Sequence, residues 1–198
     1  MDNIIFDIGN VLLRFDPETY LLNHFDEKTT YDLMTIIFSS EDWELLDLGN
    51  TTTEEVIQHL ASDHPEYKDE IAYVMHHWIS ILTPIEENVQ LISKLKEKGY
   101  KLYLLSNFHD EAFNVVSSKF EFFKLFDGGV ISYEIHELKP FHQIYETLLK
   151  RYHLNPLKSI FIDDMYANTL AANRFDINTI WLKYGTNLED ELKERNIL

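Results

Sequence analysis

The sequence contains no cysteine among its 198 residues. This absence excludes disulfide bonds, thiolate nucleophiles and thiolate zinc sites, and it is typical of proteins in a reducing compartment. No run of residues approaches the ~18 consecutive apolar residues that a membrane-spanning helix requires. The first residues also lack a basic segment followed by a long apolar one. We therefore expect a cytoplasmic protein with no signal peptide and no membrane partner.

Positive charge is scarce as well. The chain has 17 Lys and Arg against 34 Asp and Glu, and its formal net charge is -17. Proteins that bind nucleic acid neutralise its phosphates with Lys and Arg, so this balance argues against a nucleic acid partner and against anionic membranes. A phosphate ester bound by this chain would need a locally positive site, which points to a metal ion and a positioned lysine.

Apolar residues make up 45% of the chain and aromatic residues 14%, enough for a sizeable packed core. Short apolar runs that end in polar residues recur along the sequence. They cover residues 4–6, 102–105, 159–162 and 179–182, with a weaker example at 129–132. Such runs are typical of strands that are buried on both faces of a parallel sheet.

Helical patterns separate these runs. Val89, Ile92 and Leu95 recur at three-residue spacing, and Gly99 follows as a stop signal. Alternating strands and helices predict an α/β fold with a doubly wound parallel sheet. The interval from about 17 to 82 shows only helical patterns, which indicates an inserted all-helical cap. We expect the core to comprise residues 1–15 and 84–198 and the cap residues 16–83.

The polar residues that follow the apolar runs carry the predicted chemistry. Asp7, Ser106 and the pair Asp163 and Asp164 each follow a strand, and ligands of open α/β sheets bind beyond the carboxyl ends of the strands. Lys139 lies in the connection after the weak strand and can reach the same place. A carboxylate can attack phosphorus, and Mg²⁺ held by further carboxylates would neutralise the developing charge.

Each of these residues has an ordinary explanation when it is taken alone. Asp7 or Ser106 could cap a helix, and Lys139 could be a solvated surface lysine. The adjacent Asp163 and Asp164 are harder to explain, because neighbouring carboxylates repel each other unless something offsets their charge. Only the set as a whole favours a catalytic site.

The ordered set resembles the haloacid dehalogenase superfamily over essentially the whole chain. The four motifs are Phe-Asp-Ile-Gly-Asn-Val at 6–11, Leu-Ser-Asn at 105–107, Lys-Pro at 139–140 and Phe-Ile-Asp-Asp at 161–164. The resemblance implies a phosphatase with Asp7 as nucleophile and with Ser106 and Lys139 as catalytic phosphate ligands. It places Gly9, Asn10 and Asn107 around the phosphate. It implies Mg²⁺ held by Asp7, the Gly9 carbonyl, Asp164 and Asp163, with Asp164 as the principal ligand.

One position departs from the superfamily pattern. Many phosphatases of the superfamily carry a second Asp two residues after the nucleophile, which protonates the leaving group, whereas this chain has Gly9. The first motif with Gly9 in this position resembles that of a branch of the superfamily. This branch includes glucose 1-phosphatases and relatives of the N-terminal phosphatase domain of soluble epoxide hydrolase. We therefore expect a preference for good leaving groups such as sugar 1-phosphates. His109 could substitute as the acid if it faces the site.

Other functions stay open at this stage. A metal-independent dehalogenase would use the same nucleophile, but Asp163 and Asp164 would then be a costly pair. A receiver-type phosphoryl sensor has related chemistry with its acidic pair first in the chain, and a degenerate phosphate-binding protein would have lost turnover through Gly9. The expected partner is a small phosphorylated metabolite, and the sequence does not specify the oligomeric state.

Two features of the cap region bear on structure rather than chemistry. The stretch 43–49 resembles the cap of the superfamily and is expected only to build helices. Thr53, followed by Glu54 and Glu55, is expected to cap a helix.

Overall fold

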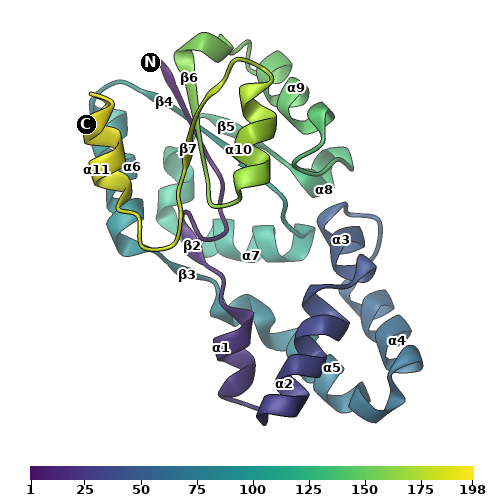
Figure 1. The fold of residues 1–198 in the computed structure, drawn as a ribbon. Helices are drawn as coiled ribbons and strands as arrows, with labels where there is room; N and C mark the ends of the chain where they lie inside the picture. The colour runs from purple at the N-terminus through teal and green to yellow at the C-terminus, as the bar shows by residue number, and fades with distance from the viewer.

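A computed structural model describes all residues, 1–198, and places a five-stranded sheet at the centre of the larger part of the molecule (Figure 1). All of its pairings are parallel and its strand order is β5-β4-β1-β6-β7. The strands are β1 (Asn3–Phe6), β4 (Lys101–Ser106), β5 (Gly128–Ile131), β6 (Ser159–Asp163) and β7 (Asn178–Trp181). The predicted doubly wound α/β fold is confirmed.

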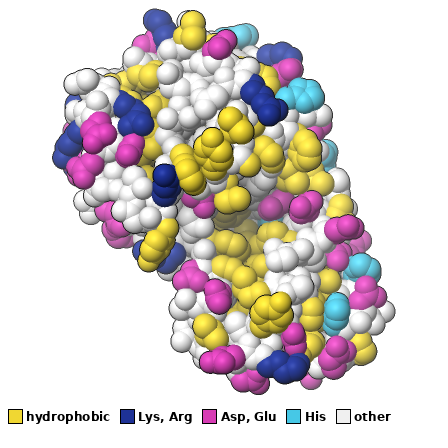
Figure 2. Space-filling model, in the orientation of Figure 1, with side chains coloured by type: hydrophobic (Ala, Val, Ile, Leu, Met, Phe, Trp, Pro, Cys, Tyr) yellow, Lys and Arg dark blue, Asp and Glu magenta, His cyan; other side chains and the backbone are white.

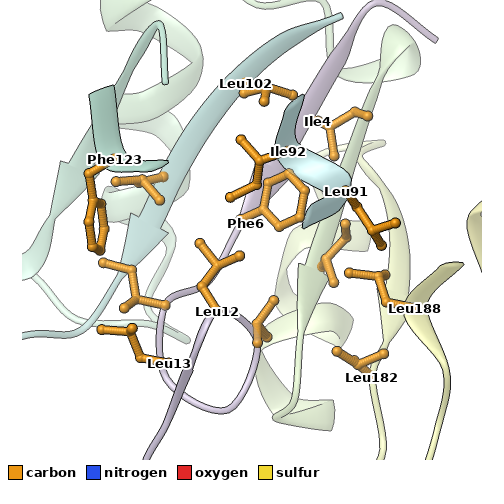
Figure 3. Packing of buried hydrophobic residues seen from close by; sticks show 14 of the residues in the cluster. Ile4, Phe6, Leu12, Leu13, Leu91, Ile92, Leu102, Phe123, Leu182 and Leu188 are labelled. Carbon is orange, nitrogen blue, oxygen red and sulfur yellow. The ribbon is translucent and has the colours of Figure 1, made fainter. Parts of the chain in front are cut away.

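The residues of β1 alternate between two hydrophobic clusters on opposite faces of the sheet. Ile4 and Phe6 belong to one cluster and Ile5 to the other, and all three side chains are fully buried. Figure 3 shows Phe6 packed among side chains of the first cluster. The helices that cover this face are α6 (Glu86–Glu97), α7 (Asp110–Lys119) and α11 (Leu188–Glu194), and those of the opposite face are α9 (His142–Arg151) and α10 (Tyr166–Asn173).

The second part of the molecule is helical and lies below the sheet in Figure 1. Its helices are α1 (Pro17–Leu22), α2 (Glu27–Leu33), α3 (Glu41–Asp47), α4 (Thr53–Asp63) and α5 (Lys68–His77), with a π-helical turn at Met34–Phe38. They enclose a hydrophobic cluster of their own, from Leu21 to Met75. These observations support the proposal that residues 16–83 form a cap on a core of residues 1–15 and 84–198.

A short antiparallel ribbon joins the two parts. It consists of β2 (Leu13–Arg14) and β3 (Thr83–Pro84), which lie where the chain enters and leaves the helical part. This ribbon is not predictable from the sequence, because two residues are too few to show a periodic pattern. Both crossings are therefore held side by side at one junction.

One helix has a different N-cap residue from the one expected from the sequence. The N-cap of α4 is Thr52 rather than Thr53: its Oγ1 accepts from Glu55 N–H, and its own N–H donates to Glu55 Oε2. Three consecutive threonines offer the same side chain, so only this reciprocal pair with Glu55 selects one of them. No helix of the structure is long and apolar enough to span a lipid bilayer.

Candidate active site

Three aspartates meet at the carboxyl edge of the sheet. Asp7 follows β1, Asp163 ends β6 and Asp164 comes next, and one oxygen of each lies within 4.8 Å of the others. Parallel pairing brings them together, because Phe6 lies opposite Ile162 and Asp7 N–H donates to the Ile162 carbonyl at 2.9 Å. Hard carboxylate oxygens in this number suit a cation such as Mg²⁺. The donor set therefore fits the metal that the motifs imply.

Asp7 is buried, and its two oxygens have different surroundings. Oδ1 accepts from Ile8 N–H at 2.7 Å and lies 2.8 Å from Lys139 Nζ, whereas Oδ2 accepts no hydrogen bond. Burial raises the pKa of Asp7 to about 7, with Lys139 acting against this and Asp163 and Asp164 adding to it. A bound divalent cation would lower this pKa and keep the carboxylate ionised.

Lys139 connects the nucleophile candidate to the acidic pair. Its Nζ lies 2.7 Å from Asp163 Oδ2 and 2.8 Å from Asp7 Oδ1, and the side chain is 2% exposed. Burial alone would lower the pKa of Lys139, but the carboxylates of Asp163 and Asp7 raise it above its ordinary value. This lysine is therefore a fixed positive charge inside the site.

The backbone of Lys139 is held by Asn107. The Asn107 side chain accepts from Lys139 N–H at 2.8 Å and donates to the Lys139 carbonyl at 3.0 Å. The structure thus places this side chain on the lysine segment, where it positions Nζ. Ser106, at the end of β4, is buried, and its hydroxyl makes only a long contact of 3.4 Å with the Asn107 carbonyl.

Asp163 and Asp164 differ in how many hydrogen bonds their carboxylate oxygens accept. Asp163 is fully buried, and it accepts from Lys139 Nζ, from Met165 N–H at 2.7 Å and from Asn168 Nδ2 at 3.0 and 3.1 Å. The carboxylate of Asp164 accepts only from Asn10 Nδ2, at 3.3 Å. Burial raises the pKa of Asp164, and so does the neighbouring Asp163. The carboxylate oxygens of Asp164 are therefore more available to bind a metal than those of Asp163.

Asn10 links the site to the junction with the helical part. Its backbone is left-handed, with φ 49°, and its Oδ1 accepts from Phe15 N–H at 3.0 Å. A cleft of about 730 Å³ runs past Asn10 and Asp164 between Arg14 and Lys183. The structure therefore places Asn10 beside the carboxylates and Arg14 in the adjoining cleft.

A second, smaller cavity of about 140 Å³ reaches the site at Gly9. A Cβ built on Gly9 would meet no atom within 4 Å, so the position opens into free space. His109 lines this cavity, which fits its expected place near the site, and Asp47, a residue not expected there, lines it as well. Asp47 belongs to the stretch 43–49, which was expected only to build helices, and it reaches the site through the packing of the helical part.

Comparisons with known proteins agree with this geometry. A family model described as haloacid dehalogenase-like hydrolase matches residues 4–182. A curated relative, the sesquiterpene phosphatase astK of Aspergillus oryzae, is 27% identical over 168 residues, which are 85% of this chain and 83% of the relative.

Solved structures share the fold over nearly the whole chain. A haloacid dehalogenase family enzyme from Bacteroides thetaiotaomicron, in complex with magnesium and inorganic phosphate, is 24% identical with a TM-score of 0.76, covering 96% of this chain and 98% of that one. A predicted hydrolase of the same family from Porphyromonas gingivalis is 20% identical with a TM-score of 0.77, covering 99% and 98%.

Proposed function

The chain belongs to the haloacid dehalogenase-like hydrolases, and on this premise we propose that it is a magnesium-dependent phosphatase acting on a small phosphate monoester. The observation that carries the proposal is the buried cluster in which Lys139 lies within 2.8 Å of both Asp7 and Asp163, next to Asp164. A nucleophilic carboxylate, a fixed ammonium and a set of hard oxygen ligands suit phosphoryl transfer by way of an aspartyl-phosphate.

Each residue of this cluster has its own role in the proposed reaction. Asp7 Oδ2, which has no hydrogen-bond donor, attacks phosphorus and forms an aspartyl-phosphate, and water then hydrolyses it. Lys139 offsets negative charge on the phosphoryl oxygens, and the Ser106 hydroxyl donates to one of them. Asp7, Asp164, Asp163 and the Gly9 carbonyl would hold Mg²⁺, which supplies further charge neutralisation when bound.

A curated relative supports a phosphatase, whereas the solved structures of this fold include dehalogenases as well as a magnesium and phosphate complex. One relative is named a sesquiterpene phosphatase, and one structure of the same fold was solved with magnesium and phosphate. A metal-free dehalogenase would have no use for Asp164, whose carboxylate has a single hydrogen-bond donor. In a magnesium-dependent phosphatase, each of the three carboxylates has a role.

Two classes of leaving group are candidates. A sugar 1-phosphate fits the missing acid at Gly9, because the anomeric oxygen departs more easily than an ordinary alkoxide. An apolar alcohol fits the walls of the 140 Å³ cavity, which include Phe15, Trp43, Trp78 and Leu82.

The test is phosphate release from a panel of sugar, terpenyl, nucleotide, acyl and aryl phosphates, with and without Mg²⁺. We expect magnesium-dependent release from at least one class by the wild-type protein and none by Asp7→Asn, because an amide cannot form the acyl-phosphate. A folded Asp7→Asn variant with wild-type activity would overturn the assignment of the nucleophile.

A further inference from the structure

The cavity beside Gly9 contains an acidic side chain that no step described above uses. Asp47 and His109 are its only titratable members among otherwise apolar or amide-bearing neighbours. Its lining residues are Gly9, Phe15, Trp43, Asp47, Trp78, Leu82, Asn107, Phe108 and His109. A Cβ on Gly9 would meet no atom within 4 Å, so an acid elsewhere in the lining of this cavity can face a substrate beside Gly9, where the chain offers no side chain.

We propose that Asp47, delivered by the helical part, is the general acid that protonates the leaving-group oxygen and later takes a proton from water. The inference rests on the proposed phosphatase function. It replaces the expectation that Gly9 leaves the site without an acid, and it assigns the acid to a residue of the cap rather than to His109.

The backbone at Asp47 is fixed against the core. The buried Ser132 hydroxyl accepts from Phe108 N–H at 2.9 Å and donates to the Asp47 carbonyl, so one side chain joins the loop after β4 to the end of α3. His136 Nδ1 lies 2.7 Å from the Leu48 carbonyl. Asp47 is thereby held over the site by contacts with α8 (Ser132–Ile135) and the turn after it.

Gly49 permits this close approach. Its φ is +67°, and a Cβ there would lie 2.8 Å from the Tyr133 carbonyl oxygen, a distance that no side chain tolerates without a shift. The glycine therefore lets the segment after α3 lie directly on the core. The contact that docks this segment on the core therefore also places Asp47 at the site.

The surroundings of Asp47 favour its protonated form. Burial raises its pKa to about 8; Lys139 acts against this, and Asp7 and Glu44 add to it. A carboxyl group with this pKa carries a proton at neutral pH, as a general acid must before the first step.

His109 is a positioning residue in this arrangement. Its Nε2 lies 3.3 Å from Asp47 Oδ1, yet the atom has no well-aligned hydrogen-bond partner. Burial lowers its pKa to about 3, so the ring is neutral, and it is packed against Trp43 and Trp78 with centroid distances of 4.4 and 4.9 Å. Because burial opposes charge on both partners, the contact joins a neutral carboxyl group and a neutral imidazole.

The proposed proton transfers balance over one turnover. In the first step a bond forms between Asp7 Oδ2 and phosphorus, the bond from phosphorus to the leaving oxygen breaks, and the Asp47 proton moves to that oxygen. In the second step water attacks phosphorus, its proton moves to the Asp47 carboxylate, and the bond to Asp7 breaks. The products are the alcohol and inorganic phosphate, and both aspartates return to their starting forms.

The experiment compares wild type with Asp47→Asn over a series from aryl phosphates with acidic phenols to alkyl phosphates. We expect log kcat/KM of the wild type to depend weakly on leaving-group pKa. In Asp47→Asn, kcat/KM for alkyl phosphates should fall by about 10²–10⁴-fold, with little change for the most acidic phenol. Retained aryl turnover also shows that the variant is folded. The matched control is Glu41→Gln, an exposed acid on the same helix, which should leave the slope unchanged.

Two further readouts separate a catalytic role from a structural one. Alkyl phosphate turnover by the wild type should fall at alkaline pH, because burial raises the pKa of Asp47 and the group loses its proton there, and Asp47→Asn should lack this limb. Gly9→Asp, introduced into Asp47→Asn, should recover part of the alkyl activity, because the side chain enters open space.

Three results would overturn the inference: an unchanged kcat/KM for alkyl phosphates in Asp47→Asn, an equal loss of kcat/KM for every leaving group, or an alkaline limb that survives the substitution. Each of these presupposes an active wild-type enzyme. Absence of magnesium-dependent aryl phosphate hydrolysis by the wild type would instead refute the phosphatase function itself, so the two failures are distinguishable.

Discussion

The three aspartates at the sheet edge differ in what their oxygens contact. Asp163 accepts hydrogen bonds on both oxygens from three different donors and is fully buried, so it acts mainly to hold Lys139. Asp164 has one weak donor and faces the larger cleft, while Asp7 keeps Oδ2 free. Identical side chains thus have different surroundings, which agree with the separate roles proposed for them.

This difference predicts an unequal response to metal. Asp164→Ala should raise the Mg²⁺ concentration needed for half-maximal activity more than Asp163→Ala does, because it removes the freer ligand. Asp163→Ala should instead reduce stability, since it leaves Lys139 with one buried partner. Magnesium titrations of turnover, paired with urea denaturation, measure both effects. A larger shift in magnesium requirement for Asp163→Ala would reverse the assignment of the principal ligand.

At the scale of elements, Asp127 ties three of them together at the amino end of the sheet. It lies just before β5 and accepts from Lys96 Nζ of α6 at 2.7 Å and from Lys101 Nζ and Leu102 N–H of β4 at 3.0 and 2.9 Å. Partial burial would raise the pKa of Asp127, but these hydrogen bonds and charges lower it from 3.8 to about 2. The folded state therefore favours the ionised carboxylate.

A stability difference follows from this shift. Because the pKa is lower in the folded state, ionised Asp127 stabilises the fold above pH 3.8, and this contribution is lost as the pH falls through about 2. Asp127→Asn should reduce the free energy of unfolding by roughly 1–3 kcal/mol at pH 7, and less at pH 3. Asp2→Asn, which removes an exposed partner of Lys158, is the control and should cost little. A pH-independent difference would contradict this cause.

The strands show which parts of the fold can be predicted from the sequence and which cannot. The strands were predictable because buried parallel strands are continuous apolar runs, and the polar residue after each run gave Asp7, Ser106, Asp163 and Asp164. The ribbon of β2 and β3 was not predictable, since its pairing depends on two crossings that are 70 residues apart. Asp47 was missed for a related reason: docking of Gly49 on the core, rather than any local pattern, brings it to the site.

At the scale of the whole molecule, the helical part lies over the mouth of the site. Figure 2 shows hydrophobic side chains gathered in the hollow between the two parts. Contacts that close the hollow include Thr53 Oγ1 with Glu111 Oε2 at 2.8 Å and Ser132 with Asp47. We expect a cover of this kind to exclude water and to open for substrate.

Access under such a cover should favour small substrates. We expect low-molecular-weight phosphate esters to be hydrolysed with a much higher kcat/KM than a folded phosphoprotein, because the bulk of a protein would prevent the helical part from closing. A phosphopeptide derived from that protein provides an intermediate size. Rapid dephosphorylation of the folded protein, together with weak activity on small esters, would contradict the role of the cap in access.

The covalent state of Asp7 during turnover gives the most direct measurement. The protein is mixed with Mg²⁺ and its best substrate, quenched in acid after a few milliseconds and digested, and the peptide that contains Asp7 is weighed by mass spectrometry. We expect this peptide to carry one phosphoryl group on Asp7 that disappears on treatment with hydroxylamine. Steady turnover with Asp7 unmodified at every time point, or with the phosphoryl group on another residue, would contradict the proposed mechanism.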